Sequence, residues 1–307
     1  MSGFETDLSD DAKEYGHQAL RAFEAAGGDE LLQQAEAKPD TRESLVAPVL
    51  DGLGVWDLEP RTDPDSLEAA AALCRSAGYW ALPYPVAERL ARPEGADGLL
   101  VVADHTPEAA LHGIDRQWAT VTLAGQRGSV ARQGATGPAF TAALEVTATA
   151  GDGTADVALG LVLPCWTLLG MLDRAIDLTT AHVSLRKQFG QTLSSFQGVQ
   201  FQLTDAEVER SGVDILAKYA LWSLGASDTQ TAINDALALR LAALEAAEVV
   251  FRVCHQLHGA VGFCDETTLS WLSRHSQPLR RLPFALSQTR DTLTTRLGRR
   301  GLTGLFS

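Results

Sequence analysis

The chain has 307 residues, of which 45% are hydrophobic and 21% are charged, as is ordinary for a globular protein. Its formal net charge of −14 argues against a nucleic-acid-binding function, because no basic stripe offsets it. No run approaches the roughly 18 apolar residues of a membrane span, so we expect no membrane segment. The acidic, polar start lacks the positive charge of a signal peptide, and we therefore expect a cytoplasmic protein.

Three helices are expected in the N-terminal part. Apolar residues recur at helical spacing in residues 8–23, and Gly27-Gly28 then breaks the pattern. Similar patterns predict a second helix over residues 42–53 and a third over residues 64–80. The third follows Asp and Ser residues that favour the start of a helix. Residues 1–82 should therefore form an N-terminal helical region.

A small β region should follow, over residues 83–155. Short runs rich in β-branched residues, bounded by Gly, Asp and Pro, predict strands at residues 101–102, 119–123 and 143–148.

From residue 156 the pattern becomes helical again. Long periodic segments, the first interrupted early by Pro164, and two shorter ones predict an up-and-down bundle: residues 157–189, 196–224, 230–257, 266–274 and 283–297. The expected fold class is thus mainly α with a small, reduced β region. We divide the chain into residues 1–82, 83–155 and 156–307.

The cysteines offer no framework for a metal site or a disulfide. No CxxC pair is present, and each of the four stands in an apolar or helical context: Cys74, Cys165, Cys254 and Cys264. We expect buried or inert thiols and no bound metal.

Two segments of the bundle carry residues suited to an anionic ligand. Arg186-Lys-Gln-Phe-Gly190 ends the first long helix, and Gln256-Leu-His-Gly-Ala-Val-Gly-Phe263 ends the third. An arginine fork and close backbone approach at glycine suit a diphosphate. Simpler interpretations remain open: an arginine at position 186 offsets the helix dipole, and Gly259 and Gly262 serve as helix C-caps.

Simpler roles are expected for three other side chains of these segments. Phe189 and Phe196 are expected to pack, and His258 to be a loop residue with a satisfied hydrogen bond.

These two motifs, in this order and at this separation, resemble those of the acyl-CoA dehydrogenase family. Its α–β–α plan also matches the expected order of elements. The resemblance implies that one subunit contacts the ADP half of an FAD held mainly by its neighbour. The contacting residues would be Arg186, Gln188, Phe189, Leu193, Gln256, Gly259 and Ala260. Gln188 and Ala260 depart from the family pattern, where a small hydroxyl residue and a glycine are common.

The resemblance also implies a carboxylate general base at one of two places, and both lack one here. One place follows Arg274 and is occupied here by Pro283. The other lies early in the first long helix, before Arg186, and corresponds to about Gly160. The stretch Val121-Thr-Leu-Ala-Gly-Gln126 offers little to a flavin ring. No residue of this chain is therefore assigned a catalytic role.

The family motifs that this chain retains would contact a neighbour's flavin. The residues that it lacks would form the chain's own active site. The resemblance therefore implies a non-catalytic subunit of a heteromeric, FAD-dependent acyl-CoA dehydrogenase. Its partner would be a catalytic subunit that binds most of the acyl-CoA, in an α2β2 assembly. Such pairs occur in actinobacteria and act on CoA thioesters of steroids.

Two alternatives remain open at this point. The chain could be a self-sufficient flavin dehydrogenase whose base has moved, with four carboxylates as candidates: Asp173, Asp177, Asp265 and Glu266. It could also be a helical scaffold without flavin. Activity of the isolated chain would favour the first, and an Arg186→Ala variant without effect on flavin binding would favour the second.

Overall fold

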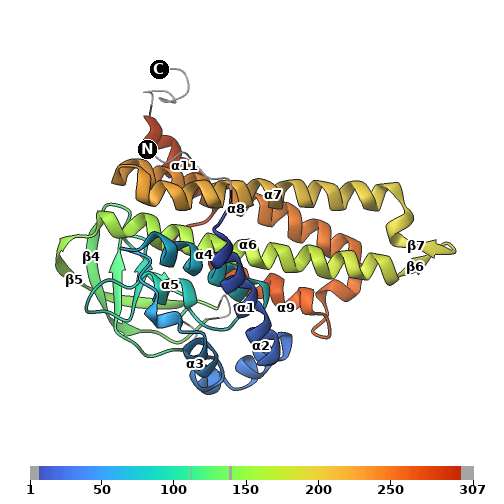
Figure 1. Cartoon of the computed structure of the whole chain (residues 1–307), viewed down its shortest axis with the longest axis horizontal. Helices are drawn as coiled ribbons and strands as arrows, with labels where there is room; N and C mark the ends of the chain where they lie inside the picture. The colour runs from blue at the N-terminus through green and yellow to red at the C-terminus, as the bar shows by residue number, and fades with distance from the viewer. Residues whose placement is uncertain (1–6, 112, 138–139, 299–307) are drawn as a thin grey trace.

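The computed structural model describes residues 7–111, 113–137 and 140–298. Helices dominate at both ends of the chain, and a small sheet lies between them (Figure 1). The predicted fold class, mainly α with a small β region, is confirmed.

The N-terminal helices are α1 (Asp10–Ala25), α2 (Asp29–Ala37), α3 (Arg42–Gly52), α4 (Pro64–Tyr79) and the short α5 (Val86–Leu90). The sequence predicted α1, α3 and α4 within two residues and missed α2. Helix α4 lies unusually close to a bundle helix. A Cβ on Gly78 would lie 1.8 Å from the carbonyl oxygen of Thr167, and a Cβ on Gly170 equally close to that of Arg75. Glycine at both positions therefore lets the two backbones touch.

The sheet contains five strands in the order β1-β3-β4-β5-β2. Strands β1 and β3 are parallel, and the other neighbours are antiparallel. The strands are β1 (Gly98–Val101), β2 (Glu108–Ala109), β3 (Trp118–Val121), β4 (Gln126–Gln133) and β5 (Ala142–Asp152). The sequence predicted β1, β3 and β5, each with shifted bounds, and missed β2 and β4.

Three long helices form the bundle: α6 (Thr154–Leu185), α7 (Gln197–Ala226) and α8 (Thr229–His258). A two-stranded hairpin and a 3-10 turn join α6 to α7. The hairpin consists of β6 (Lys187–Gln188) and β7 (Gln191–Thr192), and the turn is η3 (Leu193–Ser195). A second 3-10 turn, η4 (Gly259–Phe263), follows α8, and three short helices complete the described chain: α9 (Thr268–His275), α10 (Gln277–Arg281) and α11 (Leu286–Leu297).

Helix α6 is the centre of the molecule and corrects two expectations. It runs unbroken through Pro164, where an interruption was predicted. It is also long and apolar enough to cross a membrane, contrary to the estimate from apolar runs, because alanine, glycine and threonine extend its apolar stretch. However, 78% of that stretch is buried inside the protein, as in the core helix of a globular protein.

Candidate functional site

The predicted flavin-contact residues of the first motif lie on the β6–β7 hairpin, which projects beyond the end of the bundle (Figure 1). Gln188 pairs with Gln191, and the Leu193 N–H donates to the carbonyl oxygen of Arg186 at 2.8 Å. The two-residue loop between the strands consists of Phe189 and Gly190, with φ of +51° and +83°. Turns of this kind favour Asn-Gly, so a phenylalanine in the first position is strained.

Phe189 is not a packing residue, contrary to the prediction. Its side chain is 91% exposed, and its ring contacts only that of Phe196, edge-on at 6.3 Å between centroids, among the described ring pairs. The neighbouring Leu185 is 81% exposed. The prediction failed because the hairpin extends past the helices, so its tip is not covered by the described part of the bundle. A strained, exposed aromatic side chain at a loop tip is typical of a recognition site.

Arg186 follows directly after α6 and is not part of its last turn. Its backbone N–H donates to the carbonyl oxygen of His182 at 2.9 Å and so caps the helix. The guanidinium is exposed and forms no ion pair or hydrogen bond within the described residues. Its position near the helix C-terminus fits the dipole interpretation, while its unengaged fork can also bind an anion.

The second motif spans the end of α8 and the turn η4. Gly259 is the C-cap of α8 with φ of +66°, as the simpler interpretation predicted, and a Cβ there would meet no atom within 4 Å. Gln256 and Ala260 are exposed beside it. Gly262 is not a cap: it is buried in η4, where a Cβ would lie 2.9 Å from that of His258.

A pair of histidines joins the two motif regions. The rings of His182, near the end of α6, and His258, at the end of α8, stack with centroids 4.4 Å apart. His258 belongs to the helix rather than to a loop, and its Nδ1 lies 2.9 Å from the carbonyl oxygen of Cys254, so its predicted satisfied hydrogen bond is present. Among the described residues no hydrogen bond links the hairpin directly to residues 256–260. The stacked imidazoles are one direct contact between the ends of α6 and α8 that carry the motifs.

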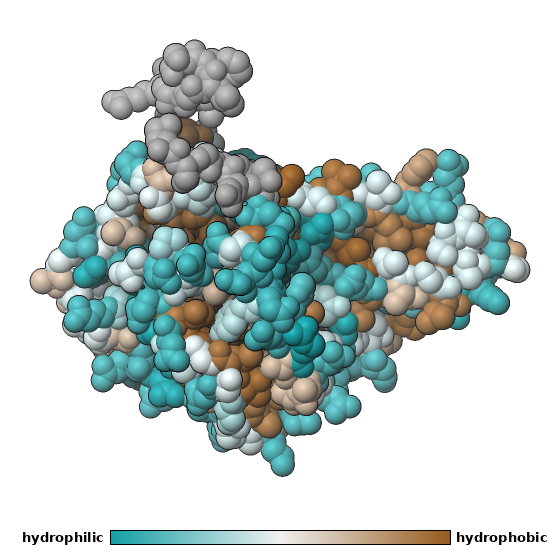
Figure 2. All heavy atoms as spheres, viewed as in Figure 1, coloured by the Kyte–Doolittle hydropathy of each residue, from teal (hydrophilic) through white to brown (hydrophobic). Residues whose placement is uncertain are grey.

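Large hydrophobic side chains reach the surface around the hairpin, along α7 and in η4. Figure 2 shows hydrophobic surface over the half of the molecule where α6 and α7 extend away from the sheet. A groove of about 590 Å³ lies between these two helices, lined among others by Ile176, Leu203 and Val208. The exposed set between residues 185 and 263 comprises Leu185, Phe189, Phe201, Val208, Ile215, Leu216, Tyr219, Val261 and Phe263. Such a concentration is typical of a protein interface.

A separate cavity lies on the other side of the bundle, and both positions at which a family base was sought line it. Gly160 on α6 and Pro283 after α10 contribute to its wall, and its volume is only about 50 Å³. A Cβ on Gly160 would lie 2.6 Å from Cγ2 of Val101, so β1 packs directly on the helix there. The position on α6 therefore has no space for a longer side chain.

Arg240 holds the segment that carries Pro283. This arginine of α8 is 3% exposed and lines the same cavity. Its guanidinium donates to the carbonyl oxygens of Leu279 at 3.1 Å and of Phe284 at 2.8 Å. The two hydrogen bonds tie this segment to α8 from the inside.

Two carboxylates line the cavity, Glu88 and Glu108, and the sequence analysis missed both. Glu108 on β2 accepts a hydrogen bond from the hydroxyl of Thr141 at 3.1 Å. Glu88 lies on α5 and forms no hydrogen bond with another described side chain. Burial raises the pKa of its carboxyl to about 7. It escaped notice because it lies in no motif, although an acidic residue between Val86-Ala87 and Leu90 in an apolar segment was a usable signal.

The four carboxylates proposed as relocated bases have other roles or positions. Asp173 binds Arg75 and Arg210, Asp177 accepts a hydrogen bond from the hydroxyl of Tyr79, and Asp265 pairs with Arg274. Glu266 is exposed. None of them lines the cavity that Gly160 and Pro283 share.

The thiols follow the prediction at three of four positions. Cys74, Cys165 and Cys254 are buried, whereas Cys264, after η4, is exposed. Burial raises the pKa of each of the three buried thiols, which keeps them protonated and unreactive at neutral pH.

The sheet carries a second concavity, of about 530 Å³. It shares only Leu99 with the lining of the small cavity. Its two arginines already have partners, since Arg116 pairs with Glu43 and Arg127 with Asp156. Neither of these two arginines therefore offers an unpaired positive charge to a ligand in this concavity.

Comparison with known proteins shows which proteins this chain resembles. Residues 153–282 match the family model described as the acyl-CoA dehydrogenase C-terminal domain. The acyl-CoA dehydrogenase FadE28 of Mycobacterium tuberculosis is 34% identical over 93 residues, which cover 30% of this chain and 27% of that protein. The acyl-[acyl-carrier-protein] dehydrogenase MbtN of Mycobacterium bovis is 32% identical over 194 residues, 57% of this chain and 48% of the relative. The matches thus span about a quarter to a half of these relatives.

Solved structures extend the likeness over nearly the whole chain. The ChsE4-ChsE5 complex from Mycobacterium tuberculosis matches with a TM-score of 0.76 at 13% identity, covering 97% of this chain and all of the matched chain. The steroid acyl-CoA dehydrogenase variant Tcur3481-Tcur3483 matches with a TM-score of 0.77 at 17% identity, covering 95% and 98%. At these identities the likeness concerns the fold. The chain has the acyl-CoA dehydrogenase fold, and its residues 153–282 match the C-terminal domain of the acyl-CoA dehydrogenase family.

The predicted contact residues fit the ADP half of an FAD. The exposed end of the bundle offers an unpaired guanidinium at Arg186, an aromatic face at Phe189 and an amide at Gln256. The open space beside Gly259 admits close approach of a ligand to the backbone. A diphosphate and an adenine ring would find their usual kinds of partner here.

Proposed function

We propose that this chain is a non-catalytic subunit of a heteromeric acyl-CoA dehydrogenase and completes the FAD site of its catalytic partner. One observation carries the proposal. The residues expected to contact the cofactor, above all Arg186 and Phe189, are exposed at or beside a hairpin that projects beyond the bundle. Side chains in this position can reach a cofactor that another chain holds.

The hydrophobic surface around the hairpin supports a permanent partner. The groove between α6 and α7 and the exposed apolar side chains between residues 185 and 263 lie along the same helices. Obligate interfaces are more apolar than ordinary protein surface, because their residues are never exposed to water in the assembly.

The chain's own cavity supports the non-catalytic role. Small-molecule and cofactor sites usually measure about 300–1,000 Å³, whereas the cavity beside Gly160 and Pro283 measures about 50 Å³. A thioester and a flavin ring need far more space than this. The close contact between Gly160 and Val101 leaves no position for a carboxylate on α6.

In the proposed assembly, the flavin supplies the hydride acceptor when it is bound. Arg186 would hold the diphosphate and offset its charge, Phe189 would offer an aromatic face to the adenine, and Gln256 would offer a hydrogen-bonding amide. Together these residues would orient the cofactor and exclude water from its ADP half. The proton of the acyl-CoA substrate is removed by the partner's base.

The assembly we propose is an α2β2 tetramer in which the partner binds the CoA thioester. A steroid-derived thioester is the substrate class to test first, because a structure titled as a steroid acyl-CoA dehydrogenase shares this fold over 95% of the chain. A cytoplasmic location is part of the same proposal.

The test is a visible absorbance spectrum of the chain purified alone and after co-expression with a genomically adjacent acyl-CoA dehydrogenase-like subunit. We expect a colourless chain alone and a yellow complex with about one flavin per pair of different subunits. A chain that is yellow by itself contradicts the proposal, as does a partner that keeps its full flavin content without this chain.

A matched pair of variants tests the role of Arg186 within the complex. Arg186→Ala should weaken flavin retention by about tenfold or more, because the loss of a charge-assisted contact leaves the diphosphate unpaired. Arg21→Ala, which removes an exposed arginine on α1, is the control and should leave retention unchanged. Equal flavin retention in both variants would remove Arg186 from the site.

A second candidate function deserves a test because of Glu88. It lines the cavity that contains both expected base positions, and it is the kind of carboxylate that can accept a proton near neutral pH. The chain would then be a dehydrogenase with a relocated base, which requires the cavity to widen on substrate binding. Flavin-dependent turnover by the isolated chain, abolished by Glu88→Gln, would support this function; a lack of turnover eliminates it.

A further inference from the structure

Three histidines and an arginine gather where the two motifs meet, and the flavin contacts do not account for the histidines. His182 lies in the last turn of α6, Arg186 directly follows that helix, and His255 and His258 lie in the last turn of α8. His182 stacks on His258, and His255 stacks on Phe263 with centroids 4.3 Å apart. We call His182, His255 and His258 the histidine cluster.

The ring nitrogens of the histidine cluster are available for protonation. With Nδ1 of His258 donating to the carbonyl oxygen of Cys254, its Nε2 is left to take up a proton. Nδ1 of His255 is buried and has no hydrogen-bond partner among the described residues. The ring of His182 forms only the stack with His258 there.

The surroundings of the cluster are positive and lack a countercharge. Among the described residues, the charged or titratable groups that act on these rings are His258 and Arg186 for His182, and His258 for His255. The closest acidic side chain in sequence, Asp265, is paired with Arg274. This is unusual in a protein with a net charge of −14.

In the free chain the cluster is held neutral. Burial lowers the pKa of all three histidines, and the neighbouring positive groups lower the pKa of His182 and His255 further. An anion beside Arg186 would reverse the second effect, since an opposite charge favours the protonated imidazole. Exclusion of water by a partner would strengthen that attraction.

We propose that the histidine cluster and Arg186 form an interaction surface for a partner that presents a diphosphate, and that this surface takes up protons when the partner binds. The inference rests on the proposed function and adds to it. The subunit senses proton concentration through its interface, and the assembly becomes tighter as the pH falls from about 7.5 to 6.

The first experiment uses the full chain alone with inorganic pyrophosphate as the probe. NMR titration of the imidazole C2–H signals should show that the pKa of His182 and His258 rises when pyrophosphate is added. The rise should disappear in Arg186→Ala and persist in Arg21→Ala. The exposed His17 on α1 serves as the internal reference.

Each other outcome overturns the inference. If pyrophosphate leaves the cluster's pKa values unchanged, or if Arg186→Ala responds like the parent chain, the cluster is not coupled to the anion. An equal response of His17 would show an adventitious ion only.

The second experiment uses the complex with the partner subunit. Its dissociation constant should decrease as the pH falls, by at most about tenfold for each pH unit and each proton taken up. His182→Phe keeps an aromatic ring against His258 but cannot take up a proton, so it should flatten this dependence; His17→Phe should not.

The failures of the two ideas can be told apart. A complex that shares its flavin but has a pH-independent affinity overturns the proton uptake and leaves the proposed function intact. If no complex forms, the proposed function fails, whereas the titration with pyrophosphate still decides whether the cluster responds to an anion.

Discussion

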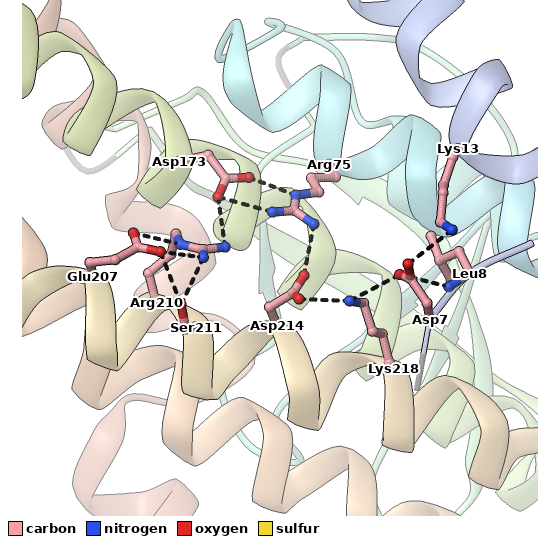
Figure 3. A network of polar contacts seen from close by, with 10 residues as sticks. All are labelled: Asp7, Leu8, Lys13, Arg75, Asp173, Glu207, Arg210, Ser211, Asp214 and Lys218. Carbon is pink, nitrogen blue, oxygen red and sulfur yellow. Dashed lines mark hydrogen bonds and ion pairs between the residues drawn. The ribbon is translucent and has the colours of Figure 1, made fainter. Parts of the chain in front are cut away.

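Near the N-terminal helices, charged side chains of α4, α6 and α7 bind one another. At the other end of α6 and α7, the guanidinium of Arg186 forms no ion pair or hydrogen bond within the described residues, and the exposed ring of Phe189 contacts only that of Phe196 among the described ring pairs. Figure 3 shows the first region, in which Arg75 contacts Asp173 at 2.6 Å and Asp214 at 2.7 Å. Lys218 continues the network from Asp214 to Asp7, at 2.8 and 3.1 Å. Polar groups are satisfied internally where the chain packs on itself and left open where we infer that a partner packs.

The largest expected effect comes from breaking the internal network. Arg75→Ala would leave two partly buried aspartates without their common cation, and we expect a loss of about 3 kcal/mol in the free energy of unfolding. Urea denaturation measures it. The exposed pair between Arg132 and Glu145 is the control, since Arg132→Ala should change stability by less than about 0.5 kcal/mol. Equal losses in both variants would show that the network contributes no more than an exposed pair.

The next effect depends on pH and concerns Glu88. Because its pKa is raised to about 7 from an unfolded value of 4.5, the folded chain binds this proton more tightly. Its contribution is therefore fully present below pH 4.5 and is lost as the pH rises to 7 and beyond. We expect a loss of about 2 kcal/mol across this window, after allowance for partial exposure.

Glu88→Gln isolates this effect from other titrating groups. The difference in unfolding free energy between the variant and the parent chain should grow in favour of the variant from pH 5 to pH 8. A difference that stays constant over this range would mean that Glu88 ionises normally in the folded chain.

A smaller loss is expected from Gly160→Ala. The added methyl group would approach Cγ2 of Val101 at 2.6 Å, so strand β1 must shift away from α6. Overpacking of this kind costs between about 1 and 2 kcal/mol. Gly198→Ala, in open space on α7, should show no such loss in thermal unfolding. If both variants melt alike, β1 is free to move.

At the open end the smallest effect has the opposite sign. Phe189→Asn places a residue that tolerates positive φ in the hairpin loop, so stability should stay the same or increase by about 0.5 kcal/mol. The same variant should lose flavin retention in the complex, because the exposed ring is removed. Lower stability with unchanged flavin content would mean that Phe189 has a structural role after all.

The parts of the fold that the sequence predicted well are those in which one face of a helix is apolar. Helices α1, α4 and α8 follow such patterns closely. Strand β4 was missed because Gln126-Arg-Gly-Ser-Val-Ala-Arg-Gln133 has neither alternation nor β-branched enrichment. It becomes a strand because β3 and β5 hydrogen-bond to both of its edges.

The candidate site was predictable only as far as its motifs extend. Arg186, Gln188 and Gln256 were named from resemblance, and their exposure agrees with an outward-facing site. The exposure of Phe189 was not predictable from the sequence. An apolar residue beside a glycine indicates a packed side chain unless the projection of the hairpin is known. Glu88 and the stack of His182 on His258 depend on contacts between elements distant in sequence, which periodicity does not encode.

The two hydrogen bonds from Arg240 also decide what a carboxylate introduced beside the small cavity could do. They fix the segment around Pro283 to the interior of α8, beside a cavity too small for a thioester. A carboxylate substituted at this position would sit on an immobilised segment with no substrate to reach. A carboxylate that reaches a substrate here would therefore need concerted changes at Arg240, at Val101 and in the cavity wall, which no single substitution supplies.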